Sequence, residues 1–338
     1  MGTENIIDEN FSQNDVPYPK SHLKSENIGT DPNFQRKIVW RNVVFMFMLH
    51  LLALYGFFLV ITFKVKLPTF VWGVFLAICA GEGITMGAHR CYSHRTFKAT
   101  LSLRLIIIIL QTLAGQNSMY VWVRDHRLHH KFTDTDADPH NATRGFFFSH
   151  VGWLLSKKHP LVKEKGKTID MSDLEADYLV MFQKRWIFVL FPMISVVFPT
   201  AVPMYLWNET FRNSFLISFV LRYVVVLNHT WTVNSLAHIY GNKPFDKNIL
   251  ASENSFVSAL TGGEGWHNYH HVFPWDYRAA EYGTSFSLTT MFIEFARNIG
   301  AAHNLKTAPR YMVERKITTS GDGSHPGYTK MANGNRSN

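Results

Sequence analysis

The chain has 338 residues, 46% of them hydrophobic, with 17 histidines, two cysteines and a formal net charge of +9. Two cysteines are too few for a disulfide-stabilised secreted domain, and no nucleic-acid-binding motif accompanies the positive charge. The length allows one large domain or two small ones, and the charge suits phosphates, an acidic protein or an anionic lipid leaflet as partners.

The N-terminal arm, residues 1–36, is polar and of mixed charge. Because it contains no early apolar stretch, we expect no cleavable signal peptide, and the first membrane span would act as the targeting signal. The folded domain is expected to occupy residues 37–316. Residues 317–338 are polar and rich in Gly and Ser, so we expect them to form a disordered tail.

Four apolar runs of about twenty residues follow the arm, at about 42–62, 69–88, 187–207 and 211–231. Each run can cross a hydrocarbon core of roughly 30 Å, and each carries aromatic residues near its ends, as membrane interfaces favour. The alternative is a set of buried helices in a soluble protein, and three prolines weaken the third run. Four such runs together favour an all-α integral membrane protein with four transmembrane helices in two hairpins.

Nine of the histidines fall into four short clusters. They are His89 and His94 in HRCYSH, His126, His129 and His130 in HRLHH, His238 in NSLAH, and His267, His270 and His271 in HNYHH. In the two HXXHH clusters the spacing i, i+3, i+4 places three imidazoles on one side of a helix. Imidazole suits iron, zinc and copper, and a structural zinc site needs only about four ligands. The pattern therefore indicates two metals that share nine histidines.

The clusters can meet only if they lie on one side of the membrane. The first follows the second span and His238 follows the fourth, so two hairpins place both on the same side. Residues 101–122 look like a fifth span, but a single crossing there would separate HRLHH from HRCYSH. We therefore expect a helix at the interface or packed under the cap of helices that carries the histidines. Lysines and arginines gather on this side, which predicts that it is cytoplasmic.

The order HX4H, HXXHH, NSXXH, HXXHH between paired spans resembles the membrane-bound acyl-CoA desaturases. GITMGAHR, RDHRLHHKFTDTDADPHNATRGFFFSHVGWLL and GEGWHNYHHVFPWDYR extend the resemblance over about residues 40–309. The insect branch, especially lepidopteran fatty-acid and pheromone-precursor desaturases, is the most similar. The resemblance implies a four-span bundle under a cytosolic helical cap in the endoplasmic reticulum. It also implies two iron ions held by the nine histidines.

The same resemblance implies roles for residues outside the clusters. Asn234 would hold a water beside the metals. Gln116, Trp122, Thr230 and Trp231 would line the tunnel where the acyl chain bends, Gly73 and Ala77 would face its closed end, and Arg124, Lys157 and Lys158 would face the phosphates and adenine of coenzyme A. For Gly73 and Ala77 ordinary helix packing is the alternative, and for the basic residues it is a solvated surface.

Acidic residues beside the clusters are candidates to orient the imidazoles from behind, or else form salt bridges in the cap. They are Asp125, Asp134, Asp138 and Glu264.

The first cluster departs from the family pattern HRLW(A/S)H, with Cys91 and Tyr92 in place of Leu and Trp, which changes the packing beside the metals. Glu82 lies inside an apolar span. A carboxylate there is either paired or functional, or lies close enough to the interface to be hydrated.

Dehydrogenation of an unactivated methylene needs a redox metal and dioxygen. Reducing dioxygen to two waters consumes two electrons more than the substrate supplies, and the chain has no dinucleotide or flavin motif. The family implies cytochrome b5 and its NADH-dependent reductase as the donor. We predict an acyl-CoA desaturase of Δ11 or Δ9 specificity. Residues 250–253 (LASE) match neither the usual Δ9 pattern nor the usual Δ11 pattern of insect relatives cleanly, which with the altered HRCYSH cluster favours an enzyme of pheromone-precursor synthesis, and a housekeeping Δ9 enzyme is the alternative. A di-iron lipid hydroxylase and a histidine-rich metal transporter are the alternatives.

Overall fold

The structure, a computed structural model, describes residues 28–281, 286–329 and 331. Within these residues, four helices are long and apolar enough to cross a membrane, at Trp40–Ile61, Leu67–Ser93, Tyr178–Trp207 and Phe211–Ile239. They overlap the four predicted spans and confirm the all-α architecture. The second and fourth helices continue past their predicted ends and so carry His89 and His238 themselves. The chain is a multi-pass membrane protein.

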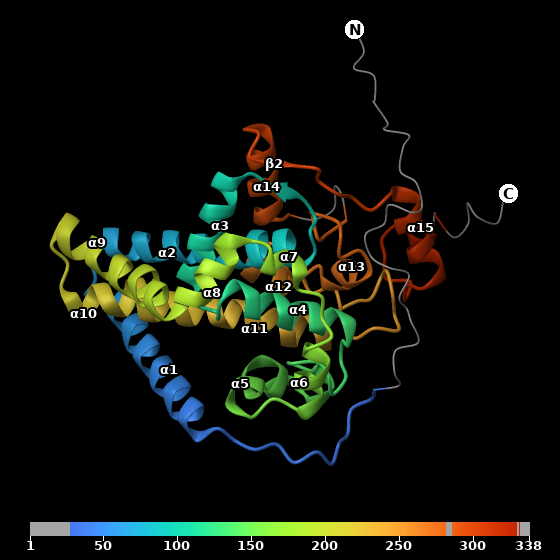
Figure 1. The fold of residues 1–338 in the computed structure, drawn as a ribbon, viewed down its shortest axis with the longest axis horizontal. Coiled ribbons are helices and arrows are strands. Elements are labelled where there is room, and N and C mark those ends of the chain that lie inside the picture. The colour runs from blue at the N-terminus through green and yellow to red at the C-terminus, as the bar shows by residue number, and fades with distance from the viewer. Residues whose placement is uncertain (1–27, 282–285, 330, 332–338) are drawn as a thin grey trace, which may run out of the picture.

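Three of these spans are built from consecutive helical segments. The first is α1 (Trp40–Ile61) alone, and the second is α2 (Leu67–Glu82) followed by η1 (Gly83–Ser93). The third comprises α8 (Tyr178–Phe191), η4 (Pro192–Val197) and α9 (Phe198–Trp207), and the fourth comprises α10 (Phe211–Ser214), η5 (Phe215–Leu221) and α11 (Arg222–Ile239). In Figure 1 α2 and α11 run side by side through the bundle, whereas α1 leans away from them.

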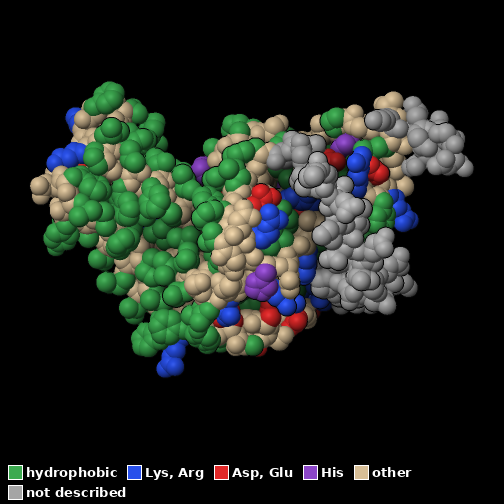
Figure 2. All heavy atoms as spheres, turned by 90° about the horizontal axis from the view of Figure 1, so that it is seen from above, with side chains coloured by type: hydrophobic (Ala, Val, Ile, Leu, Met, Phe, Trp, Pro, Cys, Tyr) green, Lys and Arg blue, Asp and Glu red, His purple; other side chains and the backbone are tan. Residues whose placement is uncertain are grey.

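The outer faces of the spans carry large apolar side chains. Phe47, Leu54 and Phe188 are exposed to 60%, 64% and 90%. Continuous apolar surface of this kind is unstable in water and is expected where lipid surrounds the protein. Figure 2 shows hydrophobic side chains covering the span end of the visible face, while most charged side chains gather over the other end. The span end is therefore the part that lies in the bilayer.

The segment predicted as one interfacial helix, residues 101–122, is two helices. α3 (Leu101–Ala114) and α4 (Met119–Lys131) meet at an elbow of 84°. Gly115, at φ +67°, ends α3, and a Cβ there would lie 2.4 Å from Cε2 of Phe191, so no larger residue fits. The bend directs α4, and with it HRLHH, toward the other histidine clusters.

The remaining elements form the cap, the helical part of the chain outside the spans. Before the third span lie α4, η2 (Ala142–Arg144), η3 (Phe148–Gly152), α5 (Trp153–Leu155), α6 (Pro160–Gly166) and α7 (Ser172–Glu175). After the fourth lie α12 (Ser255–Thr261), α13 (His267–Val272), α14 (Leu288–Asn298) and α15 (Arg310–Thr319). β1 (Lys98–Ala99) pairs antiparallel with β2 (Ala302–His303), with Lys98 opposite His303. This pairing ties the end of the first histidine cluster to the C-terminal part of the cap.

The predicted disorder from about Ile317 is wrong for the described part of the tail. Ile317 is 0% exposed and packs with Phe245, Phe273 and Val313 in one hydrophobic cluster. Val313 and Ile317 lie four residues apart on α15 and form one apolar stripe, which composition alone does not reveal. Residues 332–338 of the predicted tail and residues 1–27 of the predicted arm lie outside the described residues.

Candidate metal centre

Four structural elements bring all nine predicted histidines together. His89 lies on η1 and His94 directly after it, His238 lies at the end of α11, and the two HXXHH triplets lie on α4 and α13. The ring nitrogens form two groups, and within each group they lie within 4.8 Å of one another. The first group is His89, His94, His126, His130 and His270, and the second is His129, His238, His267 and His271. Each HXXHH triplet contributes to both groups.

Pairs of imidazole nitrogens approach closely inside each group. The Nε2 atoms of His94 and His126 lie 2.8 Å apart, and those of His238 and His267 lie 3.0 Å apart. Two nitrogens bound to one ion at about 2.1 Å, roughly at right angles, would be separated by about 3 Å. The two groups are neighbours, since the rings of His130 and His271 stack with centroids 4.3 Å apart. The donor set and its spacing therefore fit two adjacent metal ions.

The environment keeps these imidazoles in the form that binds metal. Burial, followed by the charges of neighbouring imidazoles, holds the pKa of His267, His270 and His271 well below the usual range. A neutral imidazole offers a nitrogen lone pair at physiological pH, whereas an imidazolium does not. The cluster is therefore ready to coordinate a cation without first losing protons.

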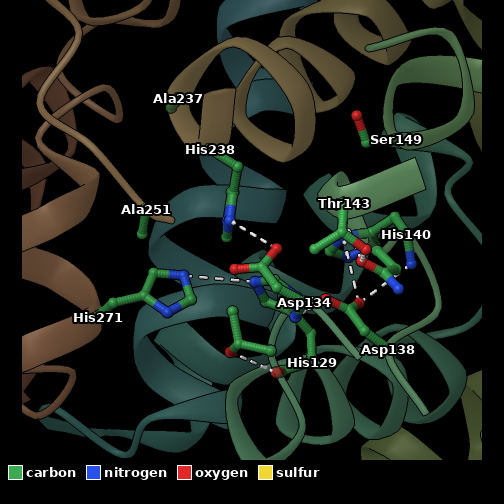
Figure 3. Close-up of polar contacts among 12 residues, drawn as sticks. His129, Asp134, Asp138, His140, Thr143, Ser149, Ala237, His238, Ala251 and His271 are labelled. Carbon is green, nitrogen blue, oxygen red and sulfur yellow. Dashed lines mark hydrogen bonds and ion pairs between the residues drawn. The ribbon is translucent and has the colours of Figure 1, made fainter. Parts of the chain in front are cut away.

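Three of the four predicted carboxylates lie behind the histidines. Oδ2 of Asp138 is 2.9 Å from Nδ1 of His129, and Oδ1 of Asp134 is 3.5 Å from Nδ1 of His238 (Figure 3). Oε2 of Glu264 is 3.5 Å from Nδ1 of His89. Burial raises the pKa of Glu264, but nearby Arg90 and His89 outweigh it and lower the pKa to about 2. An anion behind the ring fixes the tautomer that points Nε2 inward.

The fourth carboxylate, Asp125, pairs with basic side chains instead. It accepts a hydrogen bond from Arg124 and pairs with Lys158, away from the histidines. Two residues outside the predicted set also belong to the site. Arg90 is fully buried and donates to Glu264 and to the carbonyl of Tyr277, and His140 lies against His129 with ring centroids 4.4 Å apart. The sequence signal for these roles was position, since Arg90 lies in GAHR beside His89 and His140 lies in DADPH shortly after HRLHH.

A cavity extends from the histidines into the spans. Its walls include Trp122, Thr230 and Asn234 near the histidines and Ala77 farthest along α2. Gln116 does not line it but joins its walls, since it accepts a hydrogen bond from Trp122 at 3.4 Å and donates to Thr230 at 2.9 Å. The cavity therefore connects the histidines with the apolar interior of the spans.

Two predicted lining residues lie elsewhere. Trp231 is on another side of α11, where its ring lies 6.1 Å from that of His50 and 5.7 Å from that of His150. The prediction for Trp231 is wrong because adjacent helical residues point about 100° apart, and Thr230 takes the position facing the cavity. A Cβ on Gly73 would contact Ile217 at 3.2 Å, so Gly73 allows close packing of two spans, which was the alternative reading.

A second cavity of about 540 Å³ lies on the surface of the cap beside α4 and α6. Its lining contains four basic residues, Arg124, Lys158, Lys163 and Lys167, and three acidic ones, Asp125, Asp170 and Glu175. Tyr120 and Ile169 contribute an aromatic and an apolar surface. Two of the three predicted basic residues therefore share one cleft, while the third, Lys157, is exposed outside its lining.

Contacts within the protein explain the two unusual features of the second span, which are the buried Glu82 and the Cys91-Tyr92 pair. Glu82 is 7% exposed and accepts hydrogen bonds from Thr289 at 3.1 Å and Thr85 at 3.4 Å, so it is buried and paired rather than hydrated. Tyr92 donates a hydrogen bond to Asp177 at 3.1 Å, which ties the first cluster to the start of the third span. Cys91 packs beside this contact, against the hydrophobic cluster that includes Tyr92.

Comparison with known proteins agrees with this geometry. The profile of the fatty acid desaturase family matches residues 65–281. The chain is 54% identical over 293 residues to an acyl-CoA Delta-9 desaturase of Acheta domesticus, covering 86% of this chain and 81% of that protein. It is 52% identical over 294 residues to a stearoyl-CoA desaturase of Homo sapiens, covering 87% and 81%. The chain belongs to the fatty acid desaturase family and is an oxidoreductase.

A third relative shows what such similarity leaves open. An acyl-CoA Delta12-desaturase of Acheta domesticus is 52% identical over 293 residues, covering 86% of this chain and 82% of that protein. Two relatives from one organism, named for different double-bond positions, are thus almost equally similar to this chain. Overall identity therefore does not report the position at which a double bond is introduced.

Proposed function

We propose that this chain is an acyl-CoA desaturase that introduces a double bond into a saturated fatty acyl chain. The observation that carries the proposal is the cavity that starts at the two histidine groups and reaches Ala77 inside the spans. An acyl chain threaded into this cavity would place one of its methylenes beside the histidines. The cleft beside α4, whose wall carries four basic and three acidic residues, would receive the phosphates of coenzyme A, with Arg124 and Lys158 turning from Asp125 to the phosphates.

We further propose that the nine histidines hold two iron ions. The two groups consist of imidazoles alone, and imidazole suits iron, zinc and copper. Iron is favoured because two irons bound there would supply the redox chemistry with dioxygen that an unactivated methylene requires. Glu264 and Asp138 would orient His89 and His129 from behind. Asn234, on the cavity wall next to the second group, is placed to hold a water.

In this proposal the protein binds and orients the substrate and excludes water. Trp122 and Thr230 face the cavity at the histidines, so they would shape the bend of the acyl chain there. Ala77 would face its far end. The apolar walls provided by Ile84 and Val226 keep water from the reacting carbon. Dioxygen would be the oxidant, and cytochrome b5 with its NADH-dependent reductase the electron donor.

The position of the double bond, Δ11 or Δ9, and a role in pheromone-precursor synthesis are part of this proposal. Residues 250–253 support an influence on position, because they join both sides of the second histidine group. The backbone N–H of Ser252 donates to Ala237, next to His238, and the Glu253 carboxylate accepts from the backbone N–H of Tyr269 on α13. We place the protein in the endoplasmic reticulum, with its termini and cap in the cytosol.

Expression in yeast that lacks its own Δ9 desaturase tests the function. We expect new monounsaturated acyl chains, located by mass spectrometry, and loss of their formation in membranes depleted of cytochrome b5. Rescue by added cytochrome b5 would identify the donor. Hydroxylated chains in place of unsaturated ones would contradict the desaturase proposal, and Δ9 products alone would contradict the specialised one.

A further inference from the structure

A buried cation in the fourth span has no role in the function proposed above. Arg222 is 2% exposed, and none of the ion pairs among the described residues involves it. Charged side chains inside spans are costly, and they are usually paired or functional. Arg222 is instead surrounded by neutral oxygens, so the question is what this arrangement holds in place.

The guanidinium connects three helical segments. Nη1 donates to the carbonyl of Leu113 at 2.6 Å, Nη2 donates to the carbonyl and hydroxyl oxygens of Ser195 at 2.7 and 2.9 Å, and Nε donates to the carbonyl of Ser218 at 3.1 Å. Leu113 lies in the last turn of α3, where carbonyls have no intrahelical donor and the helix dipole is negative. Arg222 thus satisfies the end of α3 at a depth where no water is at hand.

The end of α3 is also the start of the elbow that aims α4. Tyr223, next to Arg222, donates its hydroxyl hydrogen bond to the carbonyl of Gly115 at 3.0 Å. The next residue, Gln116, forms hydrogen bonds with both Thr230 and Trp122. Trp122 in turn stacks on His126 with ring centroids 5.0 Å apart. An unbroken set of contacts therefore leads from Arg222 to both walls of the cavity at the histidines.

We propose that Arg222 is a positioning residue that determines which carbon of the acyl chain lies beside the histidine groups. It acts through the elbow and touches neither the cavity nor the histidines. The inference rests on the proposed desaturase function and adds regiochemistry to it. A shift of about 1 Å in a bound reactant can change reaction rates by about a hundredfold, so a small rotation of α4 would select a different methylene.

The test measures double-bond positions in the yeast assay for Arg222→Lys, Ser195→Ala and Tyr223→Phe. Lysine keeps the charge but cannot span the separate oxygens that the planar guanidinium reaches. Ser195→Ala removes one acceptor of Arg222, and Tyr223→Phe releases the Gly115 carbonyl. Ser218→Ala is the matched control, because this buried hydroxyl in the same span has no hydrogen-bond partner among the described residues.

We expect the fraction of product with a displaced double bond to rise about tenfold in Arg222→Lys, less in the other two variants, and not in the control. Unchanged positions with reduced total product would show a purely structural role and overturn the inference. If Arg222→Lys does not accumulate, the milder variants decide, and unchanged positions in both would overturn it equally. Absence of any double bond in the parent chain would instead overturn the desaturase proposal.

Discussion

Oδ2 of Asp138 lies 2.9 Å from Nδ1 of His129, and both side chains are buried in the cap. The Asp138 carboxylate also accepts hydrogen bonds from the backbone N–H groups of Asp134 and His140. It is therefore held in place from two sides while it orients the imidazole. In Figure 3 this arrangement lies beside the second pair, His238 and Asp134, so two histidines of one group have an acidic neighbour at Nδ1.

Asp138→Asn should lower metal affinity and activity by about 10–100-fold, because the neutral amide no longer fixes the His129 tautomer as strongly. Metal content per chain and product formation in membranes measure both effects. Glu314→Gln is the control, since Glu314 forms an exposed ion pair with Arg310 on α15. Equal metal content and activity in the two variants would show that Asp138 does not act through His129.

His238→Ala should abolish double-bond formation while the protein stays in the membrane. The second histidine group has four members, so the loss of one removes a quarter of its donors. Metal analysis after mild purification should give two irons in the parent chain and fewer in the variant. His303→Ala, an exposed histidine on β2, should behave like the parent. Near-normal activity of His238→Ala would refute the nine-ligand arrangement.

The contribution of Glu253 to stability should fall as the pH rises through the neutral range. Burial raises the pKa of Glu253 from its ordinary value of 4.5 to about 8, although the backbone N–H of Tyr269 stabilises its carboxylate. Between these two values the folded state binds the proton more tightly than the unfolded state, so each step up in pH costs stability until about pH 8.

Glu253→Gln should remove this contribution, because the amide does not titrate. Melting temperatures of the purified full-length proteins from pH 5 to pH 9 would be compared. The difference between the variant and the parent should widen, in favour of the variant, as the pH rises. Parallel curves for the two proteins would mean that Glu253 keeps an ordinary pKa.

Ile317→Ala should destabilise the cap by about 2–5 kcal/mol, the usual cost of truncating a fully buried isoleucine. Its side chain is 0% exposed against Phe245 and Phe273, and Phe245 donates its backbone N–H to Asn268 on α13. Thermal unfolding measures the loss, with the exposed Thr319→Ala expected within about 0.5 kcal/mol of the parent. Equal stability of both variants would show that Ile317 makes no stabilising contact and belongs to a disordered tail.

The sequence by itself determined the spans, because the length of an apolar run is a local property and the bilayer has one thickness. It also identified the nine histidines as one set, because the HXXHH spacing places three imidazoles on one side of any helix. The local motifs placed Asp134, Asp138 and Glu264 near the imidazoles, because each lies within a few residues of a cluster in the chain.

The tertiary structure decided what depends on how helices rotate and meet. It divided each HXXHH triplet between the two groups, turned Trp231 away from the cavity while Thr230 faces it, and used Gly73 to let two spans pack closely. It also bent residues 101–122 at Gly115 and buried Ile317. Each of these outcomes depends on contacts between residues far apart in the chain, such as Arg222 with Leu113, and local spacing does not encode such contacts.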